Sequence, residues 1–435
     1  MTVDTTGGAG STPVPAPVPA PAPRRGGVRS AERALAPDLA RGTMLLFIVL
    51  SNTTFHLWKS EYGPSGWQPV TGGWLDHAVQ FAMITALDLR VYPLFAFLFG
   101  YGMMQLFLRL TAAGAGAGAG ERDAVGILRR RSLLLIVIGL AHSSLLMAGD
   151  IVGYYGLLSL ALAPLFLRRS ERVLKWWIAI AAAQLVLVSA QPVISALLRG
   201  ELGSLGDAGA EPGAAAYGAG EESWFAAAGT RLTTGLFVTF TAAPFSLIGG
   251  GYVIFLLGFW AARRRILEES GRHLPLLRRT AVLGIAVGWL GALPAALAHV
   301  GALKVPDDAQ SESGALTVLR EITGYGAGLG YVAVVALFVH WWSGRAARGS
   351  AKAAVAVTAI AAVGKRSLSS YLAHSLLFAP LLAAWGLGIG ARLTSATMAL
   401  FAVGIWLVTV AGAYALERRG WRGPVEVVLR RLMYR

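Results

Sequence analysis

Long apolar runs recur along the whole chain, and shorter polar segments that hold most of the charged residues separate them. A helix needs about 20 mostly apolar residues to cross a bilayer. On this basis ten runs are interpreted as spans, and the pattern predicts an all-α polytopic membrane protein with about ten transmembrane helices. The predicted spans are roughly residues 43–57, 79–108, 132–149, 151–167, 174–198, 234–262, 280–301, 321–342, 367–388 and 394–416.

One further apolar run, residues 353–363, is too short to cross a bilayer. It stands directly before the basic stretch "GKR" (364–366). We therefore expect an interfacial or half-inserted helix there.

The composition supports a membrane protein. The 435 residues are 55% hydrophobic and 14% charged, whereas a soluble domain is usually about 25% charged. So much apolar surface requires lipid as its solvent. The chain contains no cysteine, which excludes disulfides, Cys-ligated zinc, iron–sulfur clusters and thiol catalysis. No cluster of metal-ligating residues stands out, and we expect no metal.

The two ends of the chain differ from the middle. The stretch "GGAGSTPVPAPVPAPAPRRGG" lacks the apolar core of a signal peptide, and residues 1–33 are interpreted as a disordered, Pro/Ala-rich arm. Residues 34–417 form the predicted transmembrane domain. Residues 418–435 combine basic and aromatic side chains, which is typical of an amphipathic segment on anionic lipid rather than of a nucleic-acid-binding arm.

The distribution of basic residues orients the spans. With the N-terminus in the cytoplasm, nearly all of the 38 Lys and Arg residues fall in cytoplasmic segments. Such an excess marks cytoplasmic loops, so both termini are predicted to be cytoplasmic. The Gly- and Ala-heavy usage indicates a bacterium with a GC-rich genome, and the expected location is its plasma membrane. The basic residues on the outer side are Lys59, Arg199, Arg231, Lys304, Arg320 and Arg392.

Several polar residues lie inside the predicted spans. Ionisable groups in a bilayer are costly, and each is a hypothesis for a functional site. Asn52 lies roughly 16 Å from the cytoplasmic face, Asp88 roughly 15 Å from the outer face, and Arg90 two residues further on. His142 lies near the midplane, and His374 lies roughly 12 Å inside. Four helices thus place polar groups at similar depth, which favours a site in the membrane.

Each of these residues also has a purely structural explanation. Asp88 and Arg90 can neutralise each other or pair with a neighbouring helix, and Asn52 can join two helices by a hydrogen bond. His142 can donate to a backbone carbonyl. His56 and His77 flank the outer face and can be ordinary interfacial residues.

Two glycine-rich stretches superficially suggest phosphate-binding loops. "GYGAGLG" (324–330) lies inside a predicted span with no strand before it. Close packing of helices through small residues explains it better than phosphate binding. "GGGY" (249–252) has the same interpretation.

Several segments resemble known families. "DLARG" (38–42), followed by an apolar run and an Asn, is similar to the opening of the transmembrane acyltransferase superfamily, which includes heparan-alpha-glucosaminide N-acetyltransferase. From about residue 30 onward the chain more closely resembles the YeiB-like bacterial family, a domain-of-unknown-function family. The segments that carry this second resemblance are "RVYPLFAFLFGYGM" (90–103), "RRRSLLLIVIGLAHSSLLMAGDIVGYYGLLSLAL" (129–162), "GKRSLSSYLAHSLLF" (364–378) and "GPVEVVLRRLMY" (423–434).

The superfamily resemblance implies a donor site. Asp38, Arg41 and Gly42 match the opening at the cytoplasmic mouth, where the acetyltransferases admit acyl-CoA. An Arg there suits a phosphate-rich donor. Arg90 is grouped with Asp38 and Arg41 as a candidate cofactor-binding residue. No covalently bound cofactor is expected.

The resemblance also implies catalytic residues. Asn52 matches the active-site Asn of the heparan enzyme, and His77 stands at a similar spacing before Asp88 as that enzyme's catalytic His. His56 is the alternative general base, and His142 and His374 are further candidates by depth. The His would act as general base, Asn52 would orient it or stabilise the oxyanion, and Asp88 would hold the tautomer.

Three functions follow as hypotheses. The first is an acyltransferase that moves an acyl group from cytoplasmic acyl-CoA to an extracytoplasmic or lipid-linked acceptor. The second is a proton-coupled transporter or exporter of a small molecule that uses the same polar residues. The third is a membrane-embedded partner protein without turnover. The first predicts that His77→Ala and Asn52→Ala abolish turnover and that Asp38→Ala or Arg41→Ala weakens donor affinity.

Overall fold

The computed structural model describes residues 34–114, 120–199, 213–345 and 351–434. The disordered arm predicted for residues 1–33 lies outside them. The regular elements of the described ranges are helical, and the all-α prediction is confirmed. The helices are α1 (Leu35–Ser51), α2 (Trp74–Ala86), α3 (Val91–Gly114), α4 (Glu121–Leu145), α5 (Ile151–Phe166), α6 (Glu171–Arg199), α7 (Gly213–Ala216), α8 (Trp224–Phe237), α9 (Ala243–Ile248), α10 (Val253–Arg263), α11 (Leu274–His299), α12 (Asp307–Gln310), α13 (Ala315–Arg345), α14 (Ala351–Lys365), α15 (Ser367–Leu382), α16 (Ser395–Arg418) and α17 (Pro424–Met433).

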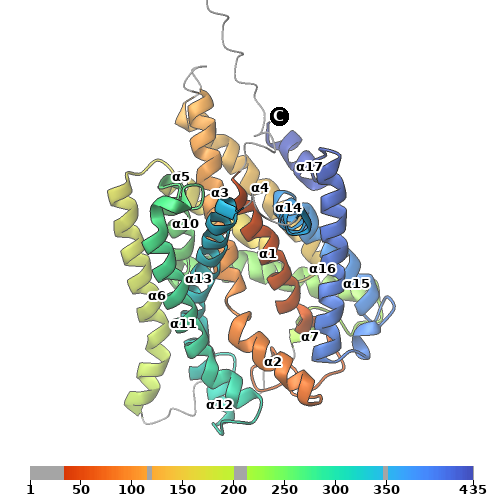
Figure 1. Cartoon of the computed structure of the whole chain (residues 1–435). Coiled ribbons are helices and arrows are strands. Elements are labelled where there is room, and N and C mark those ends of the chain that lie inside the picture. The colour runs from red at the N-terminus through yellow and green to blue at the C-terminus, as the bar shows by residue number, and fades with distance from the viewer. Residues whose placement is uncertain (1–33, 115–119, 200–212, 346–350, 435) are drawn as a thin grey trace, which may run out of the picture.

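The helices pack side by side as a bundle, with the short helix α17 at one end and α2 and α12 at the other (Figure 1). We call the end with α17 the basic end. Five basic side chains line a cavity there together with α17: Arg41, Arg109, Arg131, Arg265 and Lys365.

Six helical segments of the described residues are long and apolar enough to cross a membrane, so the chain is a multi-pass membrane protein. Each of the ten predicted spans overlaps a helix, but some of these helices are short or interrupted. The number of crossings stays a prediction. The six segments are Val91–Ala112, Glu171–Gln191, Trp224–Ile248, Ser270–His299, Asp307–Arg345 and Ser395–Arg418.

The predicted span 79–108 is broken in the middle. Helix α2 ends at Ala86 and α3 begins at Val91. Between them Leu89 has φ of 62°, a left-handed conformation that is costly for a residue with a side chain. The backbone fits because Gly324 of α13 lies against it, where a Cβ atom would stand 2.4 Å from the Leu89 carbonyl oxygen. Close contact with α13 therefore accompanies the break.

The predicted spans 132–149 and 151–167 form a hairpin whose turn is buried. Helix α5 has 16 residues, which is about 24 Å and less than a bilayer core. Helix α4 ends at Leu145, and the turn that follows is buried at Met147, Ala148 and Asp150. Arg231 of α8, which is 2% exposed, donates to the carbonyls of Ser144 (3.0 Å) and Leu145 (3.3 Å). A buried arginine thus satisfies the free carbonyls of this helix end.

The short run 353–363 forms part of α14. Its last turn is buried, with Ala361, Ala362 and Val363 at most 2% exposed. It crosses α1 at very short range. This burial favours an inserted helix over an interfacial one.

The two glycine-rich stretches have different roles. In "GYGAGLG", Gly324 and Gly328 lie against the start of α3 and the turn before it, whereas Gly326 and Gly330 lie against α11. Helix packing through small residues is confirmed for this stretch. "GGGY" instead forms the turn between α9 and α10, where Gly250 has φ of 80° and lies against α6.

Candidate functional site

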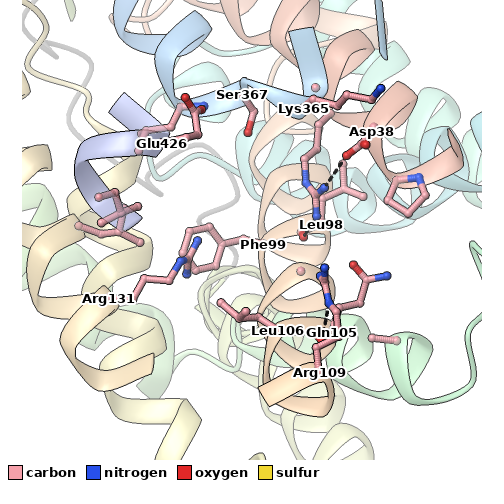
Figure 2. A pocket seen from close by; sticks show the side chains of 18 of the residues that line it. Asp38, Leu98, Phe99, Gln105, Leu106, Arg109, Arg131, Lys365, Ser367 and Glu426 are labelled. Carbon is pink, nitrogen blue, oxygen red and sulfur yellow. Dashed lines mark hydrogen bonds and ion pairs between the residues drawn. The ribbon is translucent and has the colours of Figure 1, made fainter. Parts of the chain in front are cut away.

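A cavity of about 780 Å³ opens at the basic end of the bundle. Figure 2 shows that the labelled side chains of its lining come from α1, α3, α4, α14, α15 and α17. Basic residues outnumber acidic ones in its wall, and aromatic and aliphatic side chains complete it. The basic residues are Arg41, Arg109, Arg131, Arg265, Lys365 and Arg430, and the acidic ones are Asp38, Glu268 and Glu426.

The two residues predicted for a donor site, Asp38 and Arg41, both line this cavity. Asp38 is 2% exposed and accepts a hydrogen bond of 3.2 Å from Arg41 Nη1. Arg41 Nη2 is 3.5 Å from the Leu98 carbonyl oxygen of α3. Asp38 therefore orients the guanidinium of Arg41 at the cavity wall (Figure 2).

Arg131 of α4 contributes a second guanidinium, which lies 4.9 Å from the centre of the Phe99 ring. Its Nη1 atom is buried without a hydrogen-bond partner. Its electrostatic neighbour is Arg41, a like charge, and no salt bridge joins it to a carboxylate of the described residues. Two guanidiniums in one cavity repel each other, and an anion placed between them would relieve this.

A histidine–aspartate pair lies next to the cavity. His142 Nδ1 is 2.8 Å from Asp150 Oδ1, and both side chains are buried. The other carboxylate oxygen accepts a hydrogen bond of 2.6 Å from the Gly153 N–H, so Asp150 is also the N-cap of α5. The Asp150 side chain thus lies at the start of α5, the positive end of the helix dipole. The carboxylate in turn assigns the proton to Nδ1 and leaves Nε2 as an acceptor.

The Nε2 atom of His142 is buried and has no hydrogen-bond partner. This is the arrangement of a general base whose second nitrogen is held by a carboxylate.

Tyr371 of α15 lies between the pair and the cavity. It lines the cavity, and its ring centre is 5.1 Å from that of His142. The Ile151 N–H donates to its hydroxyl at 3.4 Å. The Tyr371 ring therefore separates a molecule in the cavity from His142.

Helix α17 closes one wall of the cavity. Glu426 Oε1 accepts hydrogen bonds from the N–H groups of Leu368 (2.9 Å) and Ser369 (3.0 Å) at the start of α15. The Ser369 hydroxyl donates to the other carboxylate oxygen. One side chain thus caps α15 and attaches α17 to the cavity.

A second polar group lies at the helix break rather than at the cavity. Asp88 accepts hydrogen bonds from Ser51 (3.2 Å) and Gln68 and interacts electrostatically with Arg320. Asn52 follows Ser51 directly, as the C-cap of α1. Helix α1 therefore contacts the turn after α2 through Ser51.

Arg90 is fully buried. It donates to the backbone carbonyls of Asp88 and Gly288, the latter at 2.8 Å. It is not among the residues that line the cavity. In this structure it joins the backbone of the break to α11.

The remaining predicted histidines each have different neighbours. His77 is half-buried in the first turn of α2. His56 is buried with its ring edge against Phe378, and His374 bonds Thr409 of α16 through Nε2 at 2.9 Å. None of the three lines the cavity.

Sequence reasoning did not single out Arg131, Tyr371 or Glu426. Arg131 ends a run of three arginines that was counted as loop charge. For the neighbouring His142–Asp150 pair a local signal was available. Asp150 stands three residues before Gly153 at the start of an apolar helix, a spacing that is typical of an N-cap. Tyr371 carries no such signal, because aromatic residues are common in spans.

The fold and the cavity define a class: a multi-pass α-helical membrane protein with a basic, aromatic-lined cavity at one end. Residues 261–435 match the model of a protein family described as "Protein of unknown function (DUF418)". The resemblance to the YeiB-like family is confirmed over this segment, which supplies Tyr371 and Glu426 to the cavity. No curated protein matches the chain. The relation to the acyltransferase superfamily stays a prediction.

Proposed function

We propose that this protein is a membrane acyltransferase that takes its acyl group from acyl-CoA bound in the basic cavity. One observation carries the proposal. The lining of the cavity includes two guanidiniums, Arg41 and Arg131, and Tyr371, whose ring contacts His142 of the His142–Asp150 pair.

The cavity suits the two chemical halves of such a donor. The guanidiniums would bind phosphate oxygens, for which Arg is well adapted. The apolar lining from Phe99, Leu135 and Val152 would contact the pantetheine and acyl parts. A volume of about 780 Å³ lies within the usual range for sites that bind molecules of this size.

The His142–Asp150 pair would supply the proton transfers. His142 Nε2 accepts the proton of the acceptor's hydroxyl or amine while the oxygen or nitrogen bonds to the thioester carbonyl carbon. The carbon–sulfur bond then breaks, and the CoA thiolate leaves with the proton from the imidazolium. Asp150 is a positioning residue that holds the tautomer and stabilises the charged ring.

The proposed orientation places the basic end in the cytoplasm, because Lys and Arg concentrate there. The donor would then enter from the cytoplasm. The acceptor would be extracytoplasmic or lipid-linked.

The test is thiol release by the purified protein in lipid nanodiscs, against a panel of acyl-CoA donors. The chain has no cysteine, so every thiol detected comes from the donor. We expect His142→Ala to lower kcat by about 100-fold or more. His273→Ala, in the segment between α10 and α11, is the control and should release thiol like the unmodified protein.

His77→Ala and Asn52→Ala belong in the same assay. If His77→Ala abolished release and His142→Ala did not, His77 would be the base and the buried pair would be structural. Binding of a non-hydrolysable acyl-CoA thioether should be measured in parallel. A protein that neither releases thiol nor binds this analogue is not an acyl-CoA enzyme.

A further inference from the structure

A second hollow lies between α11 and α13. It is separate from the cavity at the basic end, which we call the donor cavity after its proposed function. It is an open groove of about 570 Å³ lined by residues from the start of α11 and the end of α13. It shares no lining residue with the donor cavity. The lining residues are Leu274, Arg278, Leu337, His340, Trp341, Gly344 and Arg345.

The groove is positively charged. Arg278 and Arg345 are exposed, and neither forms a salt bridge with a carboxylate of the described residues. The Arg345 guanidinium lies 4.8 Å from the Trp341 ring centre, which holds it at the rim. No acidic residue lines the groove. Its net charge is therefore positive and favours an anion.

The surface that leads to the groove is apolar. Both helices belong to segments long and apolar enough to span a membrane. Val282, Leu283 and Leu290 of α11 are between 62% and 68% exposed, and Val334 and Phe338 of α13 are also exposed. Such surfaces face lipid chains in a membrane protein. The arginines therefore lie where a lipid-facing surface ends, at the depth of phospholipid headgroups.

The aromatic residue at the rim fits this depth. Trp341 is 49% exposed, and Trp is enriched at membrane–water interfaces because one side of its ring is polar. Its ring centre is 5.9 Å from that of Phe338. The two rings continue the apolar surface up to the guanidiniums.

We propose that this groove binds the headgroup of an anionic phospholipid, with the phosphodiester between Arg278 and Arg345 and the acyl chains along Leu337 and Phe338. Basic pockets between spanning helices recognise anionic headgroups by this chemistry. Two arginines without a carboxylate favour a lipid of net negative charge over a zwitterionic one. The apolar surface below them favours a lipid over a free phosphate ion.

The test uses the full-length protein in nanodiscs of equal parts phosphatidylglycerol and phosphatidylcholine, with the retained lipids counted by native mass spectrometry. We expect the unmodified protein to retain phosphatidylglycerol in preference to phosphatidylcholine. The Arg278→Ala/Arg345→Ala variant should lose this preference by about tenfold, as expected for one charge-assisted contact. Both arginines are exposed, so the variant should fold, which circular dichroism checks.

The matched control is Arg168→Ala/Arg172→Ala, which removes the same charge from exposed positions, one between α5 and α6 and one in the first turn of α6. It should keep the preference. Equal loss in both double variants would show attraction by surface charge and overturn the groove site. Equal retention of the two lipids by the unmodified protein would also overturn it.

An added arm separates the lipid from a free anion. Inorganic phosphate at millimolar concentration should leave the retained phosphatidylglycerol unchanged. Displacement of that lipid by phosphate would identify a free-anion site and overturn the lipid proposal.

Discussion

Arg131 presents a guanidinium to the donor cavity with Arg41, another cation, as its electrostatic neighbour. An anionic donor would remove this repulsion and supply the missing partner of Nη1. We expect Arg131→Ala to raise the dissociation constant of an acyl-CoA analogue by about 10- to 100-fold, since a hydrogen bond to a charged group contributes roughly 1.5–3 kcal/mol. Calorimetry in nanodiscs measures it.

Arg272→Ala is the matched control for that experiment. Arg272 is exposed and pairs with Glu269, outside the cavity lining. Its loss changes net charge equally and should leave donor affinity unchanged. Equal weakening by both variants would mean that the cavity attracts anions only through total charge.

Asp76 connects α2 to α16 at the end opposite the basic end. Its carboxylate accepts hydrogen bonds of 2.9 Å from the N–H groups of Gly73 and Ala396. Burial raises the pKa of Asp76, but the hydrogen bonds from Ala396 and Gly73 and the nearby His77 outweigh it and hold the pKa below its usual value. The ionised form therefore stabilises the folded protein.

The contribution of Asp76 to the stability of the folded protein depends on pH. A carboxyl whose pKa is lowered on folding contributes fully above its unfolded pKa of about 3.9, and the contribution is lost as pH falls through the folded pKa. We expect Asp76→Asn to cost about 1–3 kcal/mol at pH 7, with the difference from the unmodified protein shrinking below about pH 4. Thermal unfolding from pH 7 to pH 3 measures this. A constant difference would contradict it, and Asp307→Asn, on exposed α12, is the control.

At this scale the sequence predicted local pairs better than distant ones. Asp38 and Arg41 are one helical turn apart, so their contact was foreseeable. The sequence left two interpretations of Asp88 and Arg90 open, mutual neutralisation or pairing with a neighbouring helix. Arg90 interacts electrostatically with Asp88, and it also donates to the Asp88 carbonyl at the break and to the Gly288 carbonyl of α11. The break itself is in close contact with α13. Tyr371 meets His142 from a helix more than 200 residues away, which no local pattern indicates.

Among the elements, α1 and α14 make the closest crossing. A Cβ atom on Gly364 would lie 1.7 Å from the Asp38 carbonyl oxygen, and one on Gly42 would lie 2.1 Å from that of Ile360. Two backbones in such contact cannot admit a side chain between them. Because Asp38 orients Arg41, this crossing also positions the donor cavity.

We expect Gly364→Ala to destabilise the protein by about 1–3 kcal/mol or more, because the two helices must move apart. Gly404→Ala in α16 is the control, since a Cβ there has no neighbour within 4 Å. That change should be neutral or stabilising by up to about 1 kcal/mol. Thermal unfolding in nanodiscs compares them, and equal stability of both variants would refute the crossing.

The apolar pattern predicted which segments are helical but not where they are interrupted. Hydropathy is averaged over many residues, so it does not respond to the left-handed backbone conformation of one residue, Leu89. It also cannot show where α4 ends, because the arginine that caps this end comes from α8. Interruptions of this kind depend on tertiary contacts that satisfy the backbone.

For the whole molecule, the orientation in the membrane is directly testable. We expect the basic end in the cytoplasm and α12 outside. The absence of native cysteine allows single-cysteine labelling of intact cells with a membrane-impermeant thiol reagent. Ser313→Cys, at an exposed position after α12, should react, whereas Arg422→Cys, exposed before α17, should not. The reverse pattern would place the donor cavity outside and refute an acyl-CoA donor.

The attachment of α17 through Glu426 also has a consequence for biosynthesis. The N–H groups at the start of α15 receive their acceptor from a residue synthesised 57 positions after Ser369. During translation α15 is made first, and its start is uncapped until α17 has been made. The donor cavity lacks one wall over the same interval. Assembly of this cavity therefore waits for α17, which is translated after α1 to α16.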